Sequence, residues 1–156
     1  MPKTAIPELQ AEVPIPHPVS GCLLFAYEYS IIGKAGGLTQ FGVHIEVLRP
    51  GSKLSLRNWH ETEDEMTYML SGEVVLFEET EPHLCKGDAA CWPAGAATTH
   101  YLENRSDADA SYLTIGTRNR LDKIHYPDHN LITHKDGAAR RYSQSDGSPY
   151  PERTSK

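Results

Sequence analysis

Side chains with the types and spacing of a metal site lie in the stretch from Gly51 to Glu73. Asn58 and His60 are two residues apart, so on a β-strand their side chains point to the same face. Glu65 begins the next strand-like run. Imidazole nitrogens and carboxylate oxygens are ligands that suit a divalent transition metal. This stretch therefore predicts part of a metal site.

A second histidine of interest lies in the stretch from Gly87 to Asn104. Pro93 and Gly95 predict a turn, and His100 lies on the strand expected after it. A fold that brings the two stretches together would add this imidazole to the first set.

The elements that must position these side chains are short strands. From Leu38 to Leu48 the residues alternate between two faces: Gly42, His44 and Glu46 share the polar one. Turn signals such as Ser71-Gly72 separate further β-like runs. This pattern predicts an all-β sandwich or barrel. The further runs are Leu54–Trp59, Met66–Leu70, Glu73–Glu78, Asp88–Trp92, Thr98–Glu103 and Ser111–Thr117.

Composition changes along the chain suggest three parts. Residues 1–37 are expected to form a proline-rich extended arm and a first strand, because proline disfavours helix. Residues 38–118 carry the motifs and are expected to form the barrel. Residues 119–156 are polar but retain tyrosines, so we expect a tail packed on its own barrel or on a partner. An apolar outer sheet face and the arm favour a homodimer.

The two stretches resemble the paired motifs of the cupin superfamily. His60 and Glu65 have four residues between them, and Glu65 and Gly72 have six, as in the first motif. Pro93 and His100 match the second motif, with Asn104 three intervening residues later. The resemblance implies a cupin double-stranded β-helix, or jelly-roll barrel. It places four residues on the metal-ligand positions: Asn58, His60, Glu65 and His100.

Three departures from the cupin pattern stand out. One extra residue separates Gly51 from Asn58, and two extra residues separate Gly95 from His100. An insertion of two preserves strand parity, so His100 still faces inward. Asn58 replaces the usual histidine, and an amide oxygen is a weaker donor than imidazole. We expect a weakly held divalent metal (Mn, Fe, Ni or Zn), the alternative being a pocket that holds only water.

The chain also resembles a narrower group of small bacterial single-domain cupins named as sugar-phosphate isomerases. The stretches that carry this likeness include SLRNWHETEDEMTYMLSGEV, GDAACWPAG and DGAARRYSQSDGSPY. It implies a metal-dependent enzyme on a sugar phosphate or a similar carbonyl compound. The alternatives are a non-haem iron dioxygenase and a small-molecule-binding cupin without activity.

Other polar residues are candidates for the chemistry and for substrate binding. His44 and Glu46 lie on the polar face before the first motif, where they could act as acid and base or simply face solvent. Five cations are candidates for an anionic substrate, unless they are scattered surface charges: Arg57, Arg105, Arg118, Arg120 and Lys123.

Composition limits the remaining classes. The net charge of −6 argues against nucleic-acid binding, which favours basic surfaces. No apolar run approaches the ~20 residues of a membrane span, and no signal-peptide-like run opens the sequence, so we expect a cytoplasmic protein. The three cysteines are odd in number and form no C-x-x-C motif, which favours free thiols.

Overall fold

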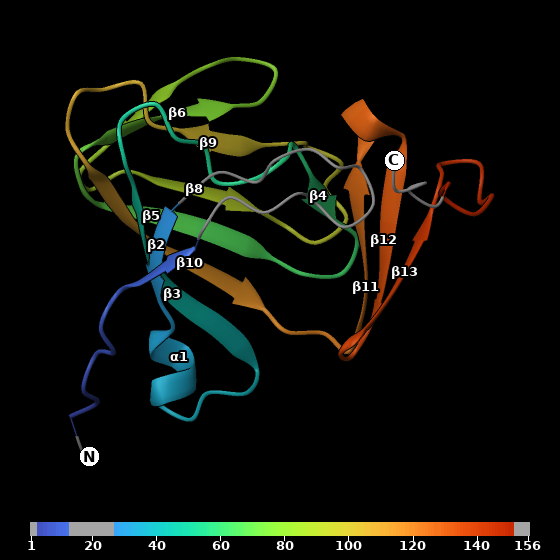
Figure 1. Ribbon diagram of the computed structural model, residues 1–156, viewed down its shortest axis with the longest axis horizontal. Coiled ribbons are helices and arrows are strands. Elements are labelled where there is room, and N and C mark those ends of the chain that lie inside the picture. Colours follow the sequence, from blue (N-terminus) through green and yellow to red (C-terminus); the bar gives the residue numbers. More distant parts are fainter. Residues whose placement is uncertain (1–2, 13–26, 152–156) are drawn as a thin grey trace, which may run out of the picture.

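The computed structural model describes residues 3–12 and 27–151. About half of these residues form strands, and the rest form one four-residue helix, one short 3-10 helix and connecting loops (Figure 1). The proline-rich segment 13–26 of the expected arm, with Cys22, lies outside the described residues. No described helix has the length and apolar character needed to cross a membrane.

Short strands joined by tight turns follow one another along the described part of the chain. The elements are β1 Gln10–Glu12, β2 Tyr27–Ser30, α1 Ile32–Ala35, β3 Phe41–Leu48, β4 Trp59–His60, β5 Glu65–Ser71, β6 Glu73–Phe77, β7 His83–Cys85, β8 Ala89–Trp92, β9 Tyr101–Glu103, β10 Ala110–Thr117, β11 Leu121–Tyr126, η1 Pro127–His129, β12 Leu131–Asp136 and β13 Ala139–Ser143.

The largest sheet has six strands in the order β1-β2-β3-β10-β5-β8. β3 and β10 pair antiparallel over their full lengths. The polar alternation predicted for β3 faces the interior: Glu46 is buried, whereas Phe41 on the other face is 40% exposed. Tyr68 of β5 is also exposed on this outer face. The expected dimer would use such a surface and stays a prediction.

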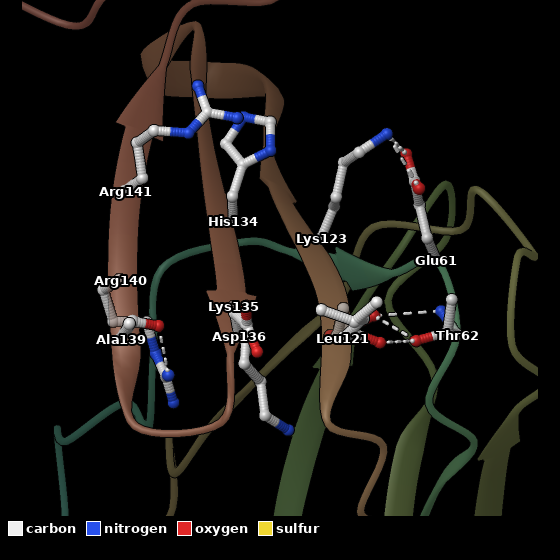
Figure 2. A pocket seen from close by; sticks show the side chains of 11 residues that line it. Glu61, Thr62, Leu121, Lys123, His134, Lys135, Asp136, Ala139, Arg140 and Arg141 are labelled. Atoms are coloured by element: carbon white, nitrogen blue, oxygen red, sulfur yellow. Dashed lines mark hydrogen bonds and ion pairs between the residues drawn. The ribbon is translucent and has the colours of Figure 1, made fainter.

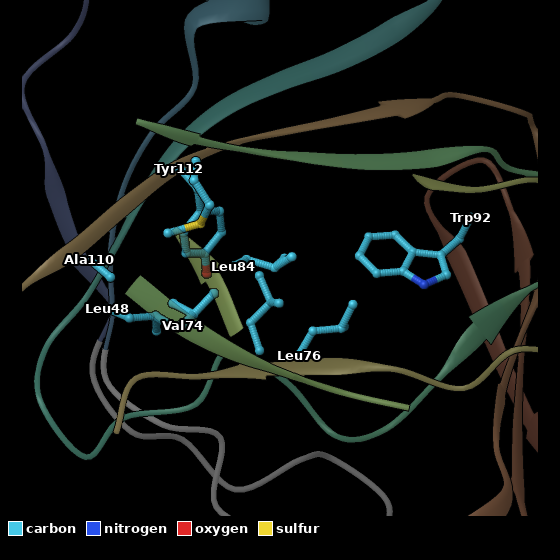
Figure 3. Packing of buried hydrophobic residues seen from close by; sticks show 9 residues of the cluster. Leu48, Val74, Leu76, Leu84, Trp92, Ala110 and Tyr112 are labelled. Carbon is cyan, nitrogen blue, oxygen red and sulfur yellow. The ribbon is translucent and has the colours of Figure 1, made fainter. Parts of the chain in front are cut away.

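A three-stranded sheet, β7-β6-β9, lies opposite the large sheet, and the apolar core fills the space between them (Figures 1 and 3). Met69, Tyr112 and Leu48 come from the large sheet, and Val74 and Leu76 come from the small one. Burying each large side chain contributes about 1.5–3 kcal/mol. Two antiparallel sheets closed around one core form the predicted jelly-roll barrel.

The turn between β5 and β6 depends on glycine. Gly72 has a φ of +70°, and a Cβ there would lie 2.5 Å from the carbonyl oxygen of Asp109. Any other residue would therefore combine backbone strain with a collision. This requirement explains the glycine that closes the first motif.

The segment after Arg118 forms a sheet of its own. β11, β12 and β13 pair antiparallel in succession, and β11 also pairs with β4 of the first motif. Figure 1 shows this C-terminal sheet at one end of the barrel. Its position beside β4 brings residues 121–136 to the metal-site candidates.

The expected strand Leu54–Trp59 is wrong in extent. The structure has only β4, Trp59–His60, with isolated bridges at Lys53 and Asn58. Leu56 is buried, and Asn58 donates to its carbonyl, so the chain bends instead of extending. Local β-propensity is overridden here by burial and by a side-chain-to-backbone hydrogen bond.

Candidate metal centre

The candidate site opens at one end of the large sheet, where three rows of side chains cross β3, β10 and β5. The rim row consists of Gly42, Gly116 and Glu65. The next row carries His44 and Thr114. The third and deepest row carries Tyr112 and Met69, which are fully buried. The sheet therefore grades from an open polar rim to a closed apolar end.

Glu65 and His100 form the closest pair of predicted ligands. Their Oε2 and Nε2 atoms lie 3.3 Å apart. Two ligand atoms that each bind one ion at about 2.1 Å, at right angles, lie about 3 Å apart, so this spacing suits a shared metal. Burial would raise the pKa of Glu65, but the hydrogen bond and charge of His100 and the charge of His60 outweigh it and lower the pKa.

His100 is held by residues of the barrel. Its ring stacks on Trp92 with centroids 3.7 Å apart and planes 5° apart. Its Nδ1 lies 3.2 Å from the carbonyl oxygen of Thr98, an acceptor, so Nδ1 carries the proton. In the neutral ring, Nε2, the atom beside Glu65, then has the lone pair that a metal requires. The hydrogen bond to Glu65 forms when Nε2 is protonated as well.

His60 is held from the C-terminal sheet. Its Nδ1 lies 2.7 Å from Oδ2 of Asp122, which is fully buried. The other oxygen of Asp122 accepts hydrogen bonds from the backbone and hydroxyl groups of Thr62. Burial would raise the pKa of Asp122, but the hydrogen bonds from His60 and Thr62 lower it. A carboxylate on Nδ1 leaves Nε2 as the nitrogen available to a metal.

A close acidic group surrounds His60. Its Nδ1 and carboxylate oxygens of Glu63 and Asp122 all lie within 4.8 Å of one another, and among the described residues this is the one such group of three His, Cys, Asp or Glu side chains. Glu63 is already in contact with the ammonium of Lys135. That ion pair compensates the charge of Glu63, so we interpret the group as support for His60.

Asn58 lies beside His100 through its backbone. The amide nitrogens and carbonyl oxygens of the two residues exchange hydrogen bonds of 3.2 and 3.0 Å, which join the two motif stretches. The side-chain Nδ2 of Asn58 donates to the carbonyl of Leu56 at 2.8 Å. The amide thus helps to shape its own loop, and its role as a ligand stays a prediction.

The predicted acid and base lie next to each other on β3. Nδ1 of His44 is 3.7 Å from Oε1 of Glu46, and Thr114 donates a hydrogen bond of 3.0 Å to Oε2 of Glu46. Nε2 of His44 is buried and has no hydrogen-bond partner among the residues described. Such an orphaned nitrogen is costly unless a ligand or water meets it.

His44, His60 and Glu65 line one cavity of about 620 Å³. This volume falls within the range of small-molecule sites. Glu46, Asn58 and His100 are not among the lining residues. The remainder of the wall mixes acidic groups, cations and small residues: Gly42, Glu63, Asp64, Thr114, Gly116, Thr117, Arg118, Asn119, Arg120 and Lys135.

Two of the residues around His60 were missed by sequence reasoning: Asp122 and Lys135. A signal for Asp122 existed, because it shares its strand face with Ile124 and Tyr126. An acidic residue on the apolar face of an alternating segment is a candidate for a buried partner. Nothing local indicated which histidine that partner would meet.

A second hollow, of about 410 Å³, lies on the outer face of the C-terminal sheet (Figure 2). Lys123, His134 and Arg141 stand in one row across three neighbouring strands. Burial and the charges of Arg141 and Lys123 lower the pKa of His134. This row lies on the opposite face of β12 from Lys135, so it is separate from the candidate metal centre.

Comparisons with known proteins agree with the barrel fold described above. The cupin domain family matches residues 44–116. A sugar phosphate isomerase from a cupin superfamily, from Silicibacter pomeroyi, is 36% identical, with a TM-score of 0.76 and 80% of each chain covered. A protein from Acidithiobacillus ferrooxidans, provisionally named a sugar phosphate isomerase, shares the fold at 23% identity, with a TM-score of 0.75 and 82% of each chain covered.

The polyketide cyclase RemF from Streptomyces resistomycificus has the same fold at 16% identity, with a TM-score of 0.57, 75% of this chain and 79% of that chain covered. No curated protein sequence matches the chain. The fold, the paired motifs and the matches therefore lead to one assignment: this chain belongs to the cupin superfamily.

Proposed function

We propose that the protein is a metal-dependent enzyme that isomerises a small oxygenated carbonyl compound of the sugar-phosphate type. The observation that carries the proposal is the Glu65–His100 pair at the open end of the barrel, with His60 and Glu65 on one cavity. The similarity to the Silicibacter pomeroyi protein supports the choice of substrate class.

The ligands in this proposal are His60, Glu65 and His100. Two imidazoles and one carboxylate suit Mn, Fe, Ni or Zn and leave coordination positions for a substrate. Asp122 and the Thr98 carbonyl hold the two imidazoles in the tautomers that leave their Nε2 atoms unprotonated. A divalent ion bound there would polarise a carbonyl oxygen and stabilise the negative charge that develops on it.

The proton transfers belong to His44 and Glu46. Isomerisation moves one proton from the carbon beside the carbonyl to the carbonyl carbon. It moves a second proton from the neighbouring hydroxyl to the carbonyl oxygen, so no atoms are gained or lost. His44 lines the cavity, which makes it the candidate base. Glu46, 3.7 Å from the other ring nitrogen, stabilises the imidazolium form.

The test is the metal content of the purified protein and its variants, measured by plasma mass spectrometry. We expect about one ion per chain in the wild type and a loss of the ion in His60→Ala and in His100→Ala. His83→Ala, which removes an exposed histidine of β7, is the matched control. Unchanged metal content in both site variants would overturn the ligand assignment.

A pair of carboxylate variants locates the ion more sharply. Glu65→Gln should lose the metal, whereas Glu63→Gln should retain it, because Glu63 pairs with Lys135. The reverse result would move the ion to the group of His60, Glu63 and Asp122. Activity is then followed by nuclear magnetic resonance in heavy water, where isomerisation leaves deuterium on the substrate carbon.

A dioxygenase is the second candidate, because two histidines and one carboxylate also form the facial set of non-haem iron oxygenases. Oxygen consumption that depends on Fe²⁺ would identify that activity. Metal-dependent isotope exchange without oxygen consumption would favour the isomerase. Ligand binding with neither reaction would instead identify a non-enzymatic binding cupin.

A further inference from the structure

The rim of the cavity contains two glycines. Gly42 and Gly116 are paired across β3 and β10, and Gly116 is paired with Glu65 across β10 and β5. The first two positions of this row carry no side chain. A Cβ on Gly116 would lie 3.3 Å from the carbonyl oxygen of Asp64, so this glycine allows the Asp64 backbone to approach the sheet.

The guanidinium of Arg118 lies over one of these glycines. A Cβ placed on Gly42 would lie 3.1 Å from Nε and 3.2 Å from Nη2 of Arg118. Arg118 follows β10 with the same parity as Gly116, and its backbone nitrogen donates to the carbonyl of Gln40. Both features turn its side chain toward the cavity that it lines.

Arg118 differs from the other cations of the cavity wall in having no acidic partner. Lys135 is bound to Glu63, and Arg120 is 2.8 Å from Asp136. For Arg118, no ion pair or side-chain hydrogen bond occurs within residues 3–12 and 27–151. Arg118 is exposed at the mouth of the cavity, so its guanidinium can offer two N–H groups to a phosphate or carboxylate in two-point contact.

We propose that Arg118 binds the anionic group of the substrate and thereby determines specificity for phosphorylated or acidic sugars over neutral ones. This inference rests on the proposed function for the position of the reacting end, at His60 and Glu65. Gly42 permits the guanidinium to lie directly over the sheet, in the row of residues that ends at the proposed metal ligand Glu65.

The test compares binding of three probes to the metal-loaded protein by calorimetry: glucose 6-phosphate, gluconate and glucose. The wild type should bind one or both charged probes at least about tenfold more tightly than glucose, and the stronger of the two identifies phosphate or carboxylate as the anion. Arg118→Gln should weaken that binding about 10- to 100-fold, because hydrogen bonds to a charged group are lost.

Two further variants separate the arginine from general charge effects. Gly42→Ala should weaken binding of the same probe by a smaller factor, because the new methyl group displaces the guanidinium. Arg120→Gln is the matched control: it removes a cation from the same wall, but one that is 82% exposed and already paired. It should change the affinity by less than about twofold.

The outcomes distinguish this inference from the proposed function. Equal affinity of Arg118→Gln and wild type for the charged probe, or a wild type that binds no charged probe more tightly than glucose, overturns the anion site. Metal content is measured on the same samples and reports on His60, Glu65 and His100 alone. Loss of charged-probe binding in Arg118→Gln with unchanged metal content supports the assignment of Arg118.

Discussion

His100 and His60 are supported by different parts of the chain. His100 stacks on Trp92 and faces the carbonyl of Thr98, so its neighbours belong to the barrel and lie within ten residues of it in the sequence. His60 depends on Asp122, which is 62 residues away in the C-terminal sheet. The cupin match ends at residue 116, before that sheet begins.

The comparison teaches that the matched cupin region contains the supporting contacts of only one of the two proposed histidine ligands. His100 has both its orientation and its tautomer fixed inside the barrel. His60 acquires its tautomer from a segment outside the family match. We therefore expect substitutions in the barrel to reduce mainly the free energy of unfolding. Substitutions in the C-terminal sheet should reduce mainly the affinity for the metal.

The largest effect should come from the barrel side. Trp92→Ala removes a core side chain that is 6% exposed, together with the surface on which His100 stacks. Unfolding in urea should show a loss of about 3–5 kcal/mol, the usual cost of truncating a buried tryptophan. Trp59→Ala, which removes a partly exposed ring stacked on His125, should lose less. Equal losses would contradict the comparison.

Metal addition should stabilise the wild type through both histidines. At a free Mn²⁺ concentration of 100 times its dissociation constant, the free energy of unfolding should rise by about 2.7 kcal/mol, and chelation should reverse the rise. His60→Ala and His100→Ala should each abolish most of it. A gain that survives in His60→Ala would show that the barrel half binds the ion alone.

Removing the support of His60 should weaken the metal without unfolding the barrel. Asp122→Ala should reduce metal affinity about 10- to 100-fold, the usual effect of losing a hydrogen-bonded partner behind a ligand. Asp122→Asn keeps an acceptor for Nδ1 and should recover part of the affinity. Asp136→Ala, an exposed carboxylate of β12, is the control, and metal titration measures all three. Wild-type affinity in Asp122→Ala would mean that the C-terminal sheet does not support the site.

The smallest expected effect is a change in the pH dependence of unfolding at high pH. It tests whether the barrel and the C-terminal sheet unfold together. Burial raises the pKa of Tyr126 in β11 to about 12, whereas the unfolded chain releases this proton near pH 10. The folded state thus holds the proton longer, so this stabilisation is complete below pH 10 and lost as the pH rises to 12. Tyr126→Phe should make the global unfolding curve less dependent on pH in that window. An unchanged dependence would indicate that the C-terminal sheet opens before the barrel.

Much of the barrel was accessible from local pattern. The alternation in residues 38–48 identified a strand and put His44 and Glu46 on one face, because side chains of a strand alternate with period two. Only the folded structure showed that this face points inward, since Glu46 is buried. The segment Leu54–Trp59 failed because burial of Leu56 and the Asn58 hydrogen bond decided its path. The residues of this segment alone set neither the length of β4 nor its pairing with β11.

The sequence by itself determined most of the barrel strands, their turns and the spacing that singled out His60, Glu65 and His100, since propensity and parity act between near neighbours. Only the tertiary structure decided that Asp122 meets His60 and that Arg118 lies over Gly42. Those contacts require β11 to pair with β4 and β10 to pair with β3. Strand pairing joins distant segments according to the packing of the whole domain, and no local pattern encodes it.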